Sequence, residues 1–152
     1  GTVTTMIDTC ATRGEAPAAT DYDVLVVGAG IGGMESALKL GDMGYKVLLV
    51  EKEASVGGKM ILLSKVFPTL DCAACILTPK MSSVRSHPNI TLWTYSDVVG
   101  VEGFTGDFTV RVRHRPRYVR EDRCTGCLEC IDRCIHIRPG AGSIVANHIT
   151  RV

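Results

Sequence analysis

Residues 24–33 read VLVVGAGIGG, and residues 47–58 read VLLVEKEASVGG. The apolar run 24–27 predicts a β-strand. The apolar residues between Ile31 and Leu38 recur with the spacing of one helix face, so a helix is predicted after the strand. A second apolar run, 47–50, predicts another strand. This order of elements is a βαβ unit with a glycine-rich turn, and it predicts an α/β fold.

The glycines of that turn follow the pattern G-x-G-x-x-G at Gly28, Gly30 and Gly33. The first glycine permits a tight turn, the second lets a pyrophosphate approach the backbone, and the third lets the helix pack on the sheet. An acid about twenty residues further on, here Glu51, accepts hydrogen bonds from a ribose diol. The alternative is a glycine-rich turn in some other βαβ unit. The first N–H groups of the predicted helix point at the phosphates, so Ile31 and Gly32 are included. The predicted dinucleotide-binding residues are therefore Gly28, Gly30, Ile31, Gly32, Gly33 and Glu51.

The residues after the second strand indicate which dinucleotide is bound. Glu51 and Lys52 are followed by the pair Gly57 and Gly58. This run resembles the E-K-x-x-x-x-G-G extension of flavoproteins that bind two dinucleotides, in which the paired glycines bring backbone close to FAD. The resemblance implies FAD as the cofactor, with NAD as the second choice. It adds Lys52, Gly57 and Gly58 to the predicted cofactor-binding residues.

Composition limits the classes of partner. The chain has 152 residues, is 45% hydrophobic and carries a net charge of +1, so a core can form and nucleic acid is not expected as the main partner. No apolar run approaches the roughly 18 residues of a membrane span, and the polar N-terminal residues do not resemble a secretory signal. Seven cysteines, an odd number, favour metal ligands and redox groups in a reducing cytoplasm over a disulfide framework.

The chain divides by composition into four predicted parts. The first is a flexible leader at residues 1–20, and the second is a cofactor-binding domain at 21–119. An iron–sulfur segment follows at 120–138, and a tail follows at 139–152.

Strand patterns continue beyond the first two strands. Residues 90–93 predict a third strand. Residues 98–104 and 107–112 predict a hairpin, with Gly103 and Gly106 in its turn region. The hairpin resembles the β-meander that follows the first βαβ units of FAD domains.

Cys72 and Cys75 form a C-x-x-C pair in the run LDCAACILTPKM. Thr78 and Pro79 suit the N-cap and first position of a helix, so a helix is predicted from Pro79 to about Ser86, just after the cysteine pair. A helix N-terminus favours a thiolate. Three roles stay open: a redox-active dithiol beside the flavin, part of an iron–sulfur ligand set completed by other thiolates, or two buried small residues. Cys72 and Cys75 are the predicted catalytic residues.

A second cysteine run has the spacing C-x2-C-x2-C-x3-C at Cys124, Cys127, Cys130 and Cys134. This is the bacterial ferredoxin spacing, and soft thiolates suit iron. Zinc is the alternative, although zinc sites more often use paired cysteines. The run departs from the ferredoxin pattern at Ile135, where proline is expected. The four cysteines are predicted to hold a [4Fe–4S] cluster, with Cys134 completing it or serving a second cluster.

Together, the glycine fingerprint, the run LDCAACILTPKM and the ferredoxin run resemble the A-subunit of heterodisulfide reductase, an iron–sulfur flavoprotein, and its relatives in sulfur metabolism. The resemblance covers about residues 21–134. It implies a Rossmann-like FAD-binding βαβ domain with a β-meander, followed by a partial ferredoxin-like 4Fe–4S segment. In this family Cys72 and Cys75 match a cysteine pair near the flavin. The family's cysteine-containing N-terminal domain, second flavoprotein half and second ferredoxin half have no counterpart here. We therefore expect a fragment, a truncated gene product or one piece of a larger assembly.

The resemblance implies a function. It is cytoplasmic electron transfer within a heterodisulfide-reductase-like complex, with the other components of that complex and a redox donor or acceptor protein as partners. FAD takes two electrons and passes them singly to a [4Fe–4S] cluster. Two alternatives remain: a pyridine-nucleotide-disulfide-reductase-type enzyme with Cys72 and Cys75 as the redox dithiol, or a truncated, non-catalytic FAD-binding remnant.

Overall fold

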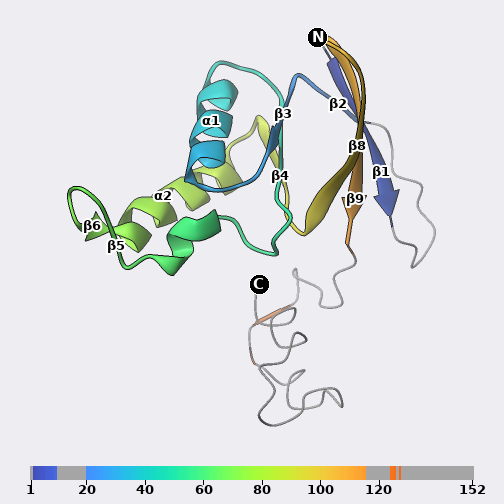
Figure 1. Cartoon of the computed structure of the whole chain (residues 1–152). Helices are drawn as coiled ribbons and strands as arrows, with labels where there is room; N and C mark the ends of the chain where they lie inside the picture. Colours follow the sequence, from blue (N-terminus) through green and yellow to red (C-terminus); the bar gives the residue numbers. More distant parts are fainter. Residues whose placement is uncertain (1, 10–19, 116–123, 126, 128–152) are drawn as a thin grey trace, which may run out of the picture. The chain divides into compact units, whose positions relative to one another are not determined.

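The computed structural model describes residues 2–9, 20–115, 124, 125 and 127 (Figure 1). The chain forms two compact units, residues 1–115 and 116–152, and each is described by itself. The proposed tail, 139–152, lies outside the described residues.

The predicted βαβ unit is confirmed. Strand β3 (Val24–Val27) leads through the glycine turn into helix α1 (Ile31–Asp42), and the chain returns in β4 (Val47–Val50). The predicted third strand is β7 (Ile90–Trp93), which pairs with β4. All three strands are parallel in the order β3-β4-β7, so their carboxyl ends meet at one edge of the sheet. Gly44, with φ +92°, allows the chain to leave α1 in the left-handed conformation.

The segment between β4 and β7 contains a 3₁₀ helix, a small hairpin and a long helix. Their bounds are η1 (Gly58–Leu62), β5 (Lys65–Val66), β6 (Asp71–Cys72) and α2 (Ala73–Ser86). The predicted helix start at Pro79 is wrong, because α2 begins at Ala73 with Cys72 as its N-cap. Leu77 and Ala73 are buried in the core, so burial extends the helix toward its N-terminus and leaves Pro79 in its interior.

A second sheet contains four strands, β2-β1-β9-β8 in that order. The predicted hairpin is confirmed as β8 (Ser96–Phe104) and β9 (Asp107–His114). The predicted β-meander is wrong, because the other edge of β9 pairs with β1 (Thr2–Thr9) in parallel. Strand β2 (Thr20–Tyr22) then pairs with β1 in antiparallel orientation. The predicted flexible leader is therefore wrong for these residues, since backbone hydrogen bonds to β9 hold β1 in the sheet.

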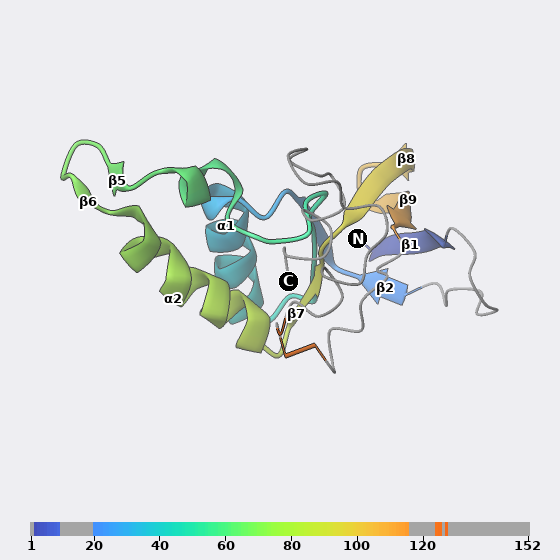
Figure 2. The same cartoon turned by 90° about the horizontal axis from the view of Figure 1, so that it is seen from below.

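Strand β4 separates two apolar clusters. Its side chains alternate, with Val47 and Leu49 packed in the cluster under the helices and Leu48 and Val50 in the cluster shared with the second sheet. All four are buried, and burying one such side chain contributes about 1.5–3 kcal/mol. Figure 1 shows the helices on one side of β3 and β4, and the second sheet on the other; Figure 2 shows α2 running beside α1. Among the described helices, none is long and apolar enough to cross a membrane.

An ion pair joins the two helices. Lys80 of α2 donates a hydrogen bond to Glu35 of α1 at 2.6 Å, and this bond lowers the pKa of the Glu35 carboxyl below its usual value. Because the pKa of Glu35 is lower in the folded state, the ion pair stabilises the fold at pH values above the ordinary pKa of a carboxyl group. This stabilisation is lost as the pH falls through the lowered pKa.

We expect wild type and E35Q to differ in free energy of unfolding at about pH 7 and to converge at about pH 3. The difference is small, because both side chains are partly exposed. Denaturant titrations of the two proteins at several pH values check this. A difference that grows on acidification contradicts it.

Candidate functional site

The turn between β3 and α1 carries the first part of the site. Gly28 has φ +97°, a conformation that glycine adopts without strain, and its N–H donates to the Val50 carbonyl at 2.7 Å. Gly30 is the N-cap of α1, with extended backbone angles. The first amides of a helix have no acceptor within it, and Gly30 has no side chain to offer one. The beginning of α1 is therefore suited to an external anion.

The glycines of the turn are required for two different reasons. A Cβ on Gly33 would lie 1.9 Å from the Gly28 carbonyl oxygen, so the close approach of α1 to the turn needs glycine there. A Cβ on Gly30 or Gly32 would meet nothing within 4 Å. The packing role predicted for Gly33 is confirmed. Open space beside Gly30 and Gly32 fits the prediction that a ligand approaches this turn.

The second glycine pair lies directly on the first turn. The Gly57 N–H donates to the Ala29 carbonyl at 2.7 Å, and Gly57 forms a parallel β-bridge with Gly30. Gly58 has φ +56°, and a Cβ there would come within 3.1 Å of the Gly30 Cα. Gly57 has φ +116°. The structure thus brings together two glycine motifs that are separated by more than twenty residues in the sequence.

Glu51 lies at the carboxyl end of β4 and is 6% exposed. One oxygen of its carboxylate accepts the Ala29 N–H at 2.6 Å, and the other accepts the Glu53 N–H at 3.0 Å. A carboxylate has about four acceptor positions, so capacity remains for a ribose diol. The sequence did not indicate that Glu51 fastens the glycine turn. Lys52, the next residue, is exposed.

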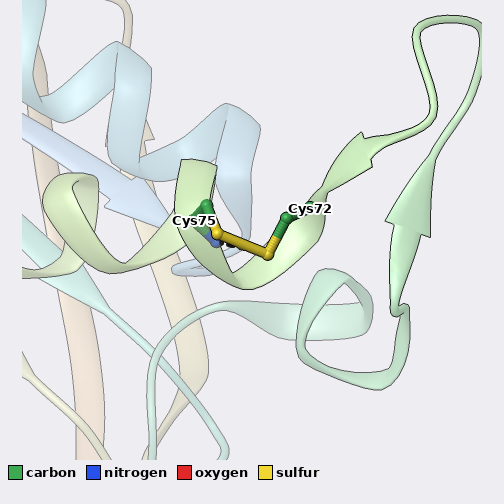
Figure 3. The surroundings of a disulfide bond; sticks show 2 residues. All are labelled: Cys72 and Cys75. Atoms are coloured by element: carbon green, nitrogen blue, oxygen red, sulfur yellow. Dashed lines mark hydrogen bonds between the residues drawn. A yellow bond between two sulfur atoms is a disulfide. The ribbon is translucent and has the colours of Figure 1, made fainter.

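Cys72 and Cys75 are joined by a disulfide, with their Cα atoms 5.2 Å apart (Figure 3). Cys72 is the N-cap of α2, and its Sγ accepts the Cys75 N–H at 3.2 Å. Both residues are exposed. The interpretation of this pair as two buried small residues is therefore wrong.

The ferredoxin run falls mostly outside the described residues. Cys124 is partly buried and Cys127 is exposed, whereas nothing is described for Cys130 and Cys134. The predicted ligand set therefore stays a prediction that rests on cysteine spacing.

Relatives of known sequence resemble most of the chain. An iron-sulfur A-subunit of CoB–CoM heterodisulfide reductase from Methanopyrus kandleri is 56% identical over 110 residues, which are 72% of this chain. The iron-sulfur A-subunit of the same enzyme from Methanocaldococcus jannaschii is 56% identical over 114 residues, which are 75% of this chain. In both cases the match covers only 17% of the relative's length.

The fold resembles that of solved oxidoreductases. The crystal structure of L-proline dehydrogenase from P. horikoshii superposes on 74% of this chain and 22% of that chain, with a TM-score of 0.52 and 17% identity. This likeness concerns the fold alone. The family described as FAD dependent oxidoreductase matches residues 23–138, a range that includes both glycine motifs, Glu51 and both cysteine runs. The chain therefore belongs to the FAD dependent oxidoreductase family, and most of it is similar to one part of heterodisulfide reductase A-subunits.

Proposed function

We propose that this chain is part of an electron-transfer iron–sulfur flavoprotein of the heterodisulfide-reductase type, which moves electrons between FAD and a [4Fe–4S] cluster. The observation that carries the proposal is the junction of two glycine motifs and one buried carboxylate. Gly57 is bonded to Ala29 and bridged to Gly30, and Glu51 holds the Ala29 amide. Such a junction suits an anionic dinucleotide with a ribose diol.

Each residue of the junction would make a different contact with FAD. The amides at the beginning of α1, from Ile31 to Gly33, would face the pyrophosphate, and the open sides of Gly30 and Gly32 would admit it. Glu51 would accept the diol, while Gly57 and Gly58 keep the backbone close to the turn. Lys52 would add positive charge near the cofactor. When bound, FAD supplies a centre that takes two electrons and releases them singly.

The cluster ligands that we propose are Cys124, Cys127, Cys130 and Cys134. Their spacing supports iron over zinc, and the names of the relatives include the words iron-sulfur. As partners we propose the other components of a heterodisulfide-reductase-like complex and a redox protein that donates or accepts electrons. The cysteine-rich composition supports a reducing, cytoplasmic location.

Cofactor analysis of protein purified without oxygen tests the proposal. We expect bound flavin together with about four irons and about four sulfides per chain. A C124S/C127S double variant is expected to lose most of the iron and to keep the flavin, because neither cysteine belongs to the glycine junction. A C10S variant is the matched control, since it removes one cysteine outside both runs, and it is expected to keep both cofactors.

Three results contradict parts of the proposal separately. Iron without flavin removes the FAD assignment from the glycine junction. Flavin without iron removes the cluster assignment from the ferredoxin run. If elemental analysis finds zinc in place of iron, the ferredoxin run has a structural role and does not transfer electrons.

A further inference from the structure

The Cys72–Cys75 disulfide is not part of the glycine junction. It lies at the beginning of α2, where β6 ends (Figure 3). Both cysteines are exposed. The proposed FAD-binding residues make no use of the disulfide. An exposed disulfide is accessible to external thiols, whereas a disulfide that stabilises a core is enclosed by it.

Two features of the structure distinguish Cys72 from Cys75. The Cys72 Sγ stands at the N-cap of a helix of 14 residues and accepts the Cys75 N–H at 3.2 Å. In the β5–β6 hairpin, Cys72 lies directly opposite Lys65, so the two side chains project on the same face. The helix N-terminus and the lysine both stabilise a negative sulfur at position 72. Cys75 is the third residue of α2, within its first turn, but it is not the N-cap and has no lysine opposite it.

We propose that Cys72 and Cys75 form a redox-active dithiol–disulfide pair that exchanges with external disulfides and thiols, and that Cys72 is the sulfur that forms the mixed disulfide. The proposal deepens the proposed function, on which it rests for its place in electron transfer, by adding a second two-electron centre to the same chain. Exchange with an external thiol does not require FAD, so the two proposals can fail independently.

The exchange balances as follows. The Cys72 thiolate attacks one sulfur of an external disulfide, a bond forms between the two sulfurs, and the other external sulfur leaves as a thiolate that takes up a proton. The Cys75 thiol then loses its proton and attacks the Cys72 Sγ, which closes the Cys72–Cys75 bond and releases the second external thiol. The dithiol is oxidised by two electrons and the external disulfide is reduced by two. Reverse exchange with an external dithiol restores the starting state.

The packing of α2 supports such a pair. Ala73 and Leu77 are buried, and a Cβ on Gly57 would come within 3.0 Å of the Leu77 side chain, so the helix is anchored beside the second glycine pair. Pro79 has no N–H and cannot donate to the Cys75 carbonyl, which an ordinary residue four positions later would do. The turn that carries the two sulfurs is therefore tied less firmly to the rest of the helix.

Charged residues lie on each of the elements around Cys72. Lys65 of β5 is paired directly opposite Cys72, and Asp71 of β6 precedes it in the sequence. Lys59 of η1 and Lys80, the first charged residue of α2, lie on the neighbouring elements but are not paired with Cys72 in the hairpin. Asp71 disfavours a thiolate at Cys72, whereas Lys65 favours it from the opposite strand. Lys65 is thus a positioning residue that acts through Cys72.

Trapping the mixed disulfide tests which sulfur reacts. Full-length protein with its cofactors is reduced with dithiothreitol without oxygen, freed of reductant and treated with oxidised glutathione, and each cysteine is then mapped by mass spectrometry. Wild type is expected to re-form the Cys72–Cys75 disulfide and to release about two glutathione thiols per chain. C75S is expected to hold glutathione on Cys72, at a rate about tenfold above that of Cys75 in C72S at about pH 7.

The pH dependence of alkylation tests the role of Lys65. In C75S the midpoint for iodoacetamide reaction at Cys72 is expected below about 8.5, the value of an ordinary thiol. Adding K65Q is expected to move that midpoint upward, while K59Q, the matched control on η1, leaves it in place. If Lys65 only stabilises the hairpin, the K65Q substitution leaves the pH midpoint of Cys72 alkylation unchanged, and the role assigned to Lys65 is wrong.

Other outcomes overturn the proposal. Equal trapping on both sulfurs removes the assignment of Cys72, and no exchange at either sulfur removes the redox role. Loss of iron in C72S or C75S assigns the pair to a cluster instead. The flavin spectrum of every sample is recorded, so loss of FAD, which concerns the proposed function, is distinguished from loss of exchange.

Discussion

Replacing Gly33 with alanine is expected to destabilise the chain by about 3 kcal/mol, at the upper end of what overpacking costs. The added Cβ would stand 1.9 Å from the Gly28 carbonyl oxygen, which is backbone and cannot rotate away. Helix α1 must therefore move off the turn, and the hydrogen bond from Gly28 to Val50 is strained with it. Thermal unfolding checks the result, and a loss of this size lowers Tm by more than about 10 °C for a domain of about 100 residues.

Gly32→Ala is the matched control for that variant. Gly32 is the neighbouring residue in the same helix, but a Cβ there meets nothing within 4 Å. Alanine is a better helix former than glycine by about 1 kcal/mol, so G32A is expected to be at least as stable as wild type. Flavin titration of G32A gives further information, because the added methyl occupies space that we assign to the cofactor. If G33A and G32A unfold at the same temperature, the close packing of α1 on the turn is refuted.

Glu51→Gln is expected to lower the free energy of unfolding by about 2 kcal/mol and to raise the Kd for FAD at least about tenfold. The two oxygens of Glu51 accept the N–H groups of Ala29 and Glu53. A glutamine has only one acceptor oxygen, and its NH₂ group must then face one of these N–H groups, whichever way the amide is turned. Since Glu51 is 6% exposed, water cannot replace the lost bond. Denaturant unfolding and flavin fluorescence titration measure the two effects.

Glu53→Gln separates charge from hydrogen bonding. Glu53 is exposed, and its contribution to the Glu51 carboxylate comes from its backbone N–H, which the substitution keeps. E53Q removes one negative charge near the site, as E51Q does, and is expected to lose much less stability and FAD affinity than E51Q. Equal losses in E51Q and E53Q would mean that net charge, and not the two hydrogen bonds of Glu51, controls the site.

Local sequence was informative wherever a short segment carries its own constraint. Gly28 needs a positive φ, and β4 is apolar at all four positions because both of its faces are covered. The hairpin β8–β9 was predictable from its alternation and from Gly103 and Gly106, which both have positive φ. These features depend on neighbouring residues, so their pattern is readable along the chain.

Segments whose structure depends on distant partners were predicted less well. The run Thr2–Thr9 is rich in β-branched residues, which favour strands, but its small polar residues are also typical of a leader. Its strand exists because it pairs with Asp107–His114, far away in the chain. The start of α2 was misplaced for a similar reason, since the burial of Leu77 and the cap at Cys72 outweigh the preference of Pro79 for a first helical position.

The sequence by itself determined the βαβ unit, its glycine turn and the identity of the residues that form the candidate FAD site. The periodicity of apolar residues and the conformation of glycines are local properties, because both depend on residues that are adjacent in the sequence. Only the tertiary structure decided that Gly57 bonds to Ala29, that Glu51 holds the same turn and that Lys65 stands opposite Cys72. These contacts join residues whose separation along the chain carries no pattern, because they form only when packing has brought their elements together.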